Sequence, residues 1–518
     1  MPNRHGKRRL FTPVGSLVLL VCAAVFGTGG ASAQTLRYAT IGEPPGLDLQ
    51  MGTATLATTI AQHMFETLYA FDSMSAPQPF LATGESVSND GRSIVIQLRE
   101  GVKFHDGDDM TAEDVAASLA RWGEFGARGT LLGYESAEVS GPLEVTLTLT
   151  EPNGAWKSLL AFPNGGPVIY PADVVEAAGG EPIEPESYIG TGPYSFGEWR
   201  PNRYVELVRF EDYVPAQGEG DGFAGAHEAL FEKLQFVPVP DVGTRVSGVQ
   251  AGDYDYAEFI SGDLYGLLKD DPAVAIRISD APIFGLLFMN SETGILAGNY
   301  PLRQAVLAAL NMEEALQVSV GDEELWEADG SFFSDGTVWN TDAGTDKYSQ
   351  DDPERAKELA AEANYDGEPI SLLVSTNYKE HFDQASVFEK QLAEAGINVE
   401  LNVTDWATLL SERGQKGKWD LFMTHHGTIP DPVLLTVMNE TYPGWWASDE
   451  KKELTARFTD TVDLQEREAI WSELQALIYE QVPTIKVGNV YSFDLASSTL
   501  ETLWDEAPAF PFFWGASK

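Results

Sequence analysis

Alternating apolar and polar positions predict several strands along this chain. Apolar residues recur at every second position over 143–149 and 397–403, and a two-residue alternation also covers 204–209. Successive side chains of a strand point to opposite faces, so this spacing is typical of strands with one buried face. Turn residues such as Asp90-Gly91 separate the predicted strands.

A second spacing predicts helices. Val115, Leu119 and Trp122 fall at positions i, i+4 and i+7, so they share one face of a helix. Thr111 and Asp114 stand where a capping box would begin that helix, with the threonine before it and the carboxylate at its third position. We therefore expect a capped helix whose apolar face packs on the neighbouring strands.

The order of the two patterns predicts the fold class. In the second half of the chain, strand patterns at 370–374, 397–403 and 420–423 alternate with helix patterns at 381–395 and 406–412. Alternating strands and helices are typical of α/β domains with a largely parallel sheet. A chain of 518 residues is long enough for two or more such domains.

The N-terminus predicts secretion. Basic residues within 4–9 precede a short apolar run over 17–26, and the small residues at 31–33 form a cleavage site. The run is short for a membrane span of about 20 apolar residues. We predict that residues 1–33 are a signal peptide, which would remove Cys22, the single cysteine, and direct the rest to the periplasm.

Net charge excludes one class of partner. The chain carries 33 Lys and Arg against 79 Asp and Glu, a formal charge of -46. Nucleic acid is not expected as a partner, because its phosphates are bound by basic side chains. We interpret the acidity as a solvated surface, and it does not by itself indicate a cationic substrate.

Three ordered motifs carry a resemblance to a known family. The first runs through 79–107, with Phe104-His105-Asp106-Gly107 at its end, into the predicted helix. The second is the string Gly-Thr-Gly-Pro-Tyr at 190–194, and the third covers 236–255. In this wording the chain resembles the extracytoplasmic solute-binding proteins of family 5, which include the peptide- and nickel-binding proteins of ABC transporters.

The resemblance implies a two-lobed periplasmic binding protein fold of α/β class, type II and cluster C-like. Lobe I would comprise residues 34–283 with an inserted subdomain at about 77–185, lobe II would comprise 284–483, and 484–518 would return to lobe I. The two crossings are expected near 282–287 and 483–487. The lobes would close around a ligand by bending at these crossings.

The function implied by this resemblance is that of a periplasmic receptor that delivers a peptide or another small organic solute to an ABC transporter permease in the inner membrane. The ligand stays open, because the family also carries oligosaccharides, opines and metal chelates. A cell-envelope enzyme is the alternative class, but the sequence has no nucleophile elbow and no His-Glu-x-x-His motif. We therefore predict no enzyme activity, no cofactor, no metal and a monomeric protein.

Candidate ligand contacts follow the predicted strands of the second domain. Peptide-binding relatives use a Thr and a Tyr that correspond to Thr376 and Tyr378. After the strand at 420–423 come His425 and His426, which point in opposite directions if they lie on a strand. One of these histidines could face the ligand cleft, and a buried structural histidine is the alternative reading.

The loop at 428–432 bears on the ligand. In peptide-binding relatives an Asp pairs with the ligand's α-ammonium group at the position of Thr428, so a neutral residue stands where those proteins place an anion. A buried ammonium needs a counter-charge, for which Asp431 or Glu43 could substitute.

Trp445 and Trp446 are the remaining candidates. Adjacent tryptophans could form a stacking wall for a ring or planar group of the ligand. The alternative is that one packs in the core and the other is partly exposed.

Overall fold

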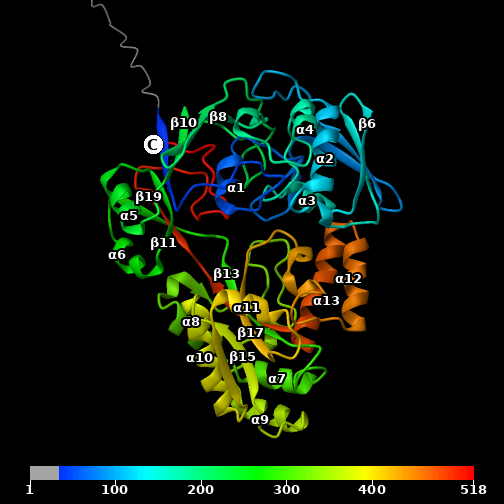
Figure 1. The fold of residues 1–518 in the computed structure, drawn as a ribbon, viewed down its shortest axis with the longest axis vertical. Helices are drawn as coiled ribbons and strands as arrows, with labels where there is room; N and C mark the ends of the chain where they lie inside the picture. Colours follow the sequence, from blue (N-terminus) through cyan, green and yellow to red (C-terminus); the bar gives the residue numbers. More distant parts are fainter. Residues whose placement is uncertain (1–33) are drawn as a thin grey trace, which may run out of the picture.

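Two mixed sheets organise residues 34–518, the part of the chain that the computed structural model describes (Figure 1). The predicted signal peptide, residues 1–33, lies outside these residues. Each sheet has its own hydrophobic core and its own covering helices. The arrangement is the two-lobed α/β architecture predicted from the sequence.

The sheet of lobe I has seven strands in the order β12-β19-β11-β1-β10-β9-β8. The first strand pairs in parallel with β10 and β11, while β19 pairs antiparallel with β11 and β12. Both ends of the chain therefore build this lobe. Its strands are β1 Thr35–Thr40, β8 Tyr194–Arg200, β9 Tyr204–Arg209, β10 Lys233–Pro238, β11 Tyr256–Ile260, β12 Val274–Ile278 and β19 Phe493–Ser497. Its helices are α1 Thr55–Ala61, α4 Ala172–Ala178, α5 Val242–Ala251 and α6 Tyr265–Leu268.

The inserted subdomain is a four-stranded antiparallel sheet in the order β4-β5-β7-β6, covered by α2. Thr111 and Asp114 form the predicted capping box, and Val115, Leu119 and Trp122 are buried in a core shared with β7. The elements are β4 Ala82–Val87, β5 Ser93–Leu98, α2 Ala112–Phe125, β6 Tyr134–Gly141, β7 Glu144–Leu149 and α3 Trp156–Ala161, next to a small sheet of β2 Tyr69–Phe71 and β3 Pro77–Pro79.

The sheet of lobe II has six strands in the order β14-β18-β13-β17-β15-β16. The parallel pairs β15–β16 and β15–β17 match the predicted alternation of strands and helices. Its strands are β13 Ile283–Met289, β14 Trp326–Glu327, β15 Ile370–Ser375, β16 Val399–Thr404, β17 Leu421–Gly427 and β18 Thr484–Val490. Its helices are α7 Tyr300–Ala309, α8 Met312–Ser319, α9 Pro353–Glu362, α10 Lys379–Glu394, α11 Trp406–Arg413, α12 Asp449–Asp460 and α13 Leu464–Gln481.

Short 3₁₀ helices lie between these elements, at η1 Gly129–Leu131, η2 Pro185–Ser187, η3 Gly262–Leu264, η4 Glu323–Leu325, η5 Thr345–Lys347, η6 Pro432–Leu434 and η7 Thr436–Met438. Within residues 34–518, no helix combines the length and the apolar character that a membrane crossing requires.

The chain crosses between the lobes at two places. The first crossing joins β12 to β13 at 279–282, just before the predicted segment. The second joins β18 to β19 at 491–492, later than the predicted 483–487, because β18 pairs with β13 along its length inside lobe II. The apolar side chains of Ile485 and Val487 are buried in the lobe II core, which explains why this strand stays there.

The lobes touch on both sides of the space between them. On the side of the inserted subdomain, the Gly154 N–H donates to the Thr459 carbonyl at 2.6 Å, and α12 and α13 stand beside that subdomain (Figure 1). On the other side, Tyr265 of α6 donates a hydrogen bond to Glu324 of η4, and Lys269 Nζ lies 3.3 Å from the same carboxylate. The two lobes therefore contact each other on both sides of the space between them.

Candidate functional site

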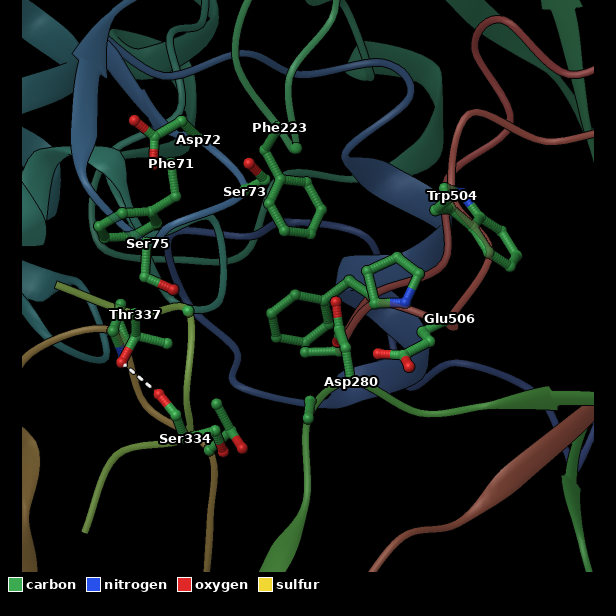
Figure 2. A pocket seen from close by; sticks show the side chains of 18 of the residues that line it. Phe71, Asp72, Ser73, Ser75, Phe223, Asp280, Ser334, Thr337, Trp504 and Glu506 are labelled. Atoms are coloured by element: carbon green, nitrogen blue, oxygen red, sulfur yellow. Dashed lines mark hydrogen bonds between the residues drawn. The ribbon is translucent and has the colours of Figure 1, made fainter. Parts of the chain in front are cut away.

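A cavity of about 650 Å³ lies between the two lobes (Figure 2). Its size falls in the range of about 300–1,000 Å³ that is usual for small-molecule sites. Lobe I contributes 71–73, 75, 162–163, 220–223, 503–506, 508–510 and 512, lobe II contributes 284, 332–337, 428–430 and 489, and the first crossing contributes 280–282. A molecule in this cavity would contact both lobes and the segment that joins them.

Aromatic side chains form much of the cavity wall. Phe512 stacks on Trp514 with ring centroids 4.2 Å apart, and Trp514 stacks on His227 at 3.8 Å. Burial lowers the pKa of His227 to about 3, so this imidazole is neutral at physiological pH. Phe512, which lines the cavity, is therefore held in place by a stack of two residues that do not line it. The aromatic residues that line the cavity are Phe71, Phe162, Phe223, Trp504, Phe510 and Phe512 of lobe I and Phe284, Phe332 and Phe333 of lobe II.

The charged groups of the lining are all acidic. They are Asp72, Asp221, Asp280, Asp335, Asp505 and Glu506. Two of them are used within lobe I, because Asp72 accepts hydrogen bonds from the backbone of Met74 and Ala76, and Asp221 accepts one from the backbone of Ser73. Among the described residues that line the cavity there is no Lys, Arg or His.

Asp280 has a carboxyl group with a raised pKa. Burial, and secondarily the nearby Glu506, raise its pKa to about 7. The side chain of Asp280 is exposed to the open cavity. The protein around the cavity still removes enough water from the carboxyl group to disfavour its charged form. The Asp280 N–H donates to the Ala507 carbonyl at 3.0 Å, which holds the first crossing against the C-terminal segment that carries Glu506.

One of the nine predicted site residues, Thr428, is among the residues that line the cavity, and the other eight are not. Its hydroxyl donates to the Pro282 carbonyl at 2.9 Å, so it joins β17 to the first crossing. Asp431 and Glu43, which were predicted to replace the Asp that relatives have at position 428, do not line the cavity. Asp431 is fully buried in a two-bond ion pair with Arg467. Glu43 accepts a hydrogen bond from the backbone of Asn202 outside the cavity.

The two histidines of β17 point in opposite directions, as their adjacent positions predict. The His426 ring stacks on Phe284, behind the cavity wall, with centroids 5.6 Å apart. His425 lies 3.2 Å from His381 of α10, measured from Nδ1 to Nε2, and both pack with Tyr378. Neither histidine lines the cavity, and neither do Tyr378 and the exposed Thr376.

The adjacent tryptophans lie in the core of lobe II. Trp446 is 4 % exposed and donates to Gln481 Oε1 at 2.7 Å. Trp445 stacks on Trp419 with ring centroids 5.6 Å apart. Neither is among the residues that line the interlobe cavity. Their positions fit the structural alternative, with one tryptophan packed and the other partly exposed.

Sequence reasoning missed most of the cavity lining. Asp280 stands just before the predicted crossing, and the acidic stretch at 501–506 precedes the aromatic C-terminal tail. These were the available signals, but carboxylates are so frequent in this chain that none stood out. The segment at 332–337 had no strand or helix pattern to mark it.

The described residues contain no cluster of three or more His, Cys, Asp or Glu side chains placed to hold a metal ion. The His381–His425 contact is therefore a pair without a third ligand of these types in the part of the chain that the structure covers.

Comparisons with known proteins agree with this geometry. The chain is 30% identical over 487 residues to a probable peptide ABC transporter periplasmic-binding protein of Sinorhizobium fredii, covering 90% of each chain. It is 25% identical to the glutathione-binding protein GsiB of Salmonella typhi, over 88% of this chain and 89% of that one. The fold matches that of the ABC transporter substrate-binding protein CtaP of Listeria monocytogenes with a TM-score of 0.78 at 21% identity, covering 93% of this chain and 98% of that one.

A family model gives the decisive match. The model for bacterial extracellular solute-binding proteins, family 5 Middle, aligns with residues 76–446, which is well over half of the chain. The aligned region includes the inserted subdomain, the first crossing and most of lobe II. The protein belongs to the bacterial extracellular solute-binding proteins of family 5.

Proposed function

We propose that this protein is a periplasmic receptor of an ABC importer, which captures a peptide or another small organic solute between its lobes and presents it to a permease. The observation that carries the proposal is the interlobe cavity, which draws its walls from both lobes and from the crossing between them. Family membership and the similarity to a probable peptide-binding protein support the same role.

Capture would proceed by hinge bending. The lobes are connected by two short segments, 279–282 and 491–492, so a small change in these backbones can swing one lobe relative to the other. A ligand that contacts both walls binds the closed form better than the open form, and this difference in affinity drives closure. The Gly154–Thr459 hydrogen bond, which joins the inserted subdomain to lobe II far from both crossings in sequence, would break when the lobes swing apart.

The proposed receptor binds without turnover and works as a monomer. The cavity lining offers carboxylates, hydroxyls and aromatic rings, and its hydroxyl-bearing residues are not paired with a histidine base in the described structure. An importer would take the solute unchanged, so a receptor needs affinity and release and no chemistry on its cargo.

A solute screen tests the proposal. The protein, purified from the periplasmic fraction of cells that express the full sequence, is mixed with peptides, opines, sugars and metal chelates, and its melting temperature is followed. We expect a subset of solutes to raise the melting temperature, to bind with one-to-one stoichiometry, to shrink the radius of gyration in solution scattering, and to be recovered chemically unchanged. Turnover of the bound solute would contradict the receptor function, and an unchanged radius would contradict closure.

A further inference from the structure

We propose that the solute is an organic cation, whose ammonium or guanidinium group is held by Asp280 and Glu506 while its apolar part lies against the aromatic walls. This inference rests on the proposed receptor function and names the chemical class of its ligand. It is drawn from the charges, contacts and burial at one end of the interlobe cavity.

The two carboxylates come together from different parts of the chain. Asp280 is on the first crossing and Glu506 is on the C-terminal segment of lobe I, and Figure 2 shows their side chains next to each other at the cavity. The Asp280–Ala507 hydrogen bond and a parallel bridge between Ser279 and Ala507 fix the two segments side by side. Glu506 is near enough to help raise the pKa of Asp280, and neighbouring carboxylates repel each other unless a proton or a cation lies between them.

The described chain supplies no cation for this pair. Neither Asp280 nor Glu506 forms an ion pair or accepts a hydrogen bond from another side chain within residues 34–518. Two basic side chains pack on rings of the cavity wall, and each has partners of its own. Lys486 Nζ lies 5.2 Å from the Phe284 ring centroid and pairs with Asp329 at 3.2 Å. The Arg128 guanidinium lies 5.2 Å from the Phe162 ring centroid and donates hydrogen bonds to Asn164. A positively charged group would complete the site, whereas an anionic group placed beside these two carboxylates would be repelled.

An unsatisfied acceptor in the wall favours a ligand that carries hydrogen-bond donors. Asn489 is 1% exposed and lines the cavity. Its Nδ2 donates to Asp329 at 3.2 Å, and this bond to a carboxylate fixes which end of the amide is which. The Oδ1 atom is buried and has no hydrogen-bond partner in the described structure. A buried acceptor without a donor is costly, and the N–H groups of an ammonium or guanidinium are donors of the kind it lacks, as are those of a neutral amide.

The aromatic walls suit a cation as well. Phe223 and Phe512 face the cavity from lobe I with ring centroids 5.4 Å apart, and Phe284 and Phe332 face it from lobe II at 6.3 Å. The faces of aromatic rings attract positive charge and also bury apolar surface. Carboxylates beside aromatic rings therefore fit a molecule that is charged at one end and apolar along its body.

A set of matched probes tests the charge of the ligand. Each set holds three molecules of similar size that differ in charge, such as the tripeptides Ala-Arg-Ala, Ala-citrulline-Ala and Ala-Glu-Ala with acetylated N-termini and amidated C-termini, which leaves the central side chain as the only charged group. Non-peptide guanidines and amines and their neutral and carboxylate counterparts form further sets. Binding is measured by calorimetry on the wild-type protein, on Asp280→Asn and Glu506→Gln, and on Asp253→Asn, an exposed carboxylate outside the cavity.

We expect the cationic members to bind at least tenfold more tightly than the neutral ones, and both cavity variants to lose at least tenfold in affinity for them. The Asp253→Asn variant should bind as the wild type does. Equal or tighter binding of neutral or anionic members, or unchanged affinity in both cavity variants, would overturn the cation assignment and leave the receptor function standing. If no probe of any charge binds and no molecule co-purifies with the protein, the receptor function itself is contradicted.

Discussion

Asp431 and Asp280 lie in neighbouring regions of one molecule, and the structure surrounds them in opposite ways. Asp431 is fully buried in lobe II, where Arg467 donates two hydrogen bonds to its carboxylate at 2.9 and 3.0 Å. Asp280 faces the interlobe cavity beside Glu506, and the described chain gives it no cation. Asp431 therefore has a counter-charge within the protein, whereas the charged group next to Asp280 is a second carboxylate.

The contrast separates stability from binding. A carboxylate whose partner belongs to the chain stabilises the folded protein, and its loss leaves a buried guanidinium unpaired. A carboxylate without an internal partner costs stability when it ionises, and that cost is relieved when a ligand brings the opposite charge. The Asp431 region should therefore respond to mutation in unfolding experiments, and the Asp280 region in binding experiments.

The largest expected effect is on Asp431. Replacing it with Asn leaves the Arg467 guanidinium buried without a counter-charge, which should lower the free energy of unfolding by about 3–5 kcal/mol. Urea denaturation of the ligand-free protein measures this change, and Asp366→Asn, at an exposed position, serves as the control. An unfolding free energy within experimental error of the wild type would break the comparison, because it would show that the internal pair does not stabilise lobe II.

The next largest effect is expected from a mutation at Gly154, which lies at the contact between the lobes. A Cβ atom at this position would lie 1.8 Å from the Thr461 carbonyl oxygen across the interlobe contact, and the clash disappears when the lobes separate. Gly154→Ala should therefore enlarge the radius of gyration in solution scattering and weaken solute affinity about tenfold or more. The matched control is Gly46→Ala, since a Cβ there meets nothing within 4 Å. Wild-type affinity in Gly154→Ala would show that binding does not require this closed contact.

A smaller effect is expected from pH at Asp280. Its pKa is raised from 3.8 to about 7 in the folded protein, so between these values the folded state holds a proton that the unfolded state has lost. The wild type therefore loses stability as pH rises from about 4 to about 7, and the loss stays constant above that. Asp280→Asn removes this cost.

The melting temperature of Asp280→Asn should exceed that of the wild type at pH 8 by roughly 1–2 °C, and the difference should vanish near pH 4. Scanning calorimetry at several pH values measures it. A variant that is more stable and yet binds its solute less well would sharpen the comparison. A variant less stable than the wild type at pH 8 would show that Asp280 has an internal partner after all.

The smallest effect is expected in the aromatic wall. Phe223→Leu keeps an apolar side chain but removes the ring, so the affinity for a cationic solute should fall by about threefold, which corresponds to ~0.7 kcal/mol. Calorimetric titration measures the change, with Phe125→Leu, an exposed position on α2, as control. Equal affinity in both variants would leave the carboxylates as the only attraction for the cation.

The sequence predicted the fold better than the site. The capping box of α2, the alternation in β7 and β9 and the parallel order of β15, β16 and β17 arise from local spacing, which a single sequence records directly. The cavity instead arises where segments far apart in sequence meet. Asp280 and Glu506 are more than two hundred positions apart, and no local pattern pairs them.

The predicted site residues also show that a single sequence does not reveal tertiary contacts. Thr428 was singled out because it occupies the position at which peptide-binding relatives place an Asp, and it lines the cavity. Trp445, Trp446 and Asp431 attract attention by residue type, but their partners Trp419, Gln481 and Arg467 lie inside lobe II. Whether a polar or aromatic side chain faces a ligand depends on which internal partner it meets, and tertiary structure decides that.

Native mass spectrometry tests the central claim most directly. The wild-type protein and the Asp280→Asn/Glu506→Gln double variant are purified without denaturation from the bacterium that naturally makes the protein, and the bound small molecule is released and identified. The account predicts one organic molecule with a positive charge per wild-type protein, and its loss from the double variant. A molecule without an ammonium or guanidinium group, or a cationic molecule retained equally by both proteins, would contradict it.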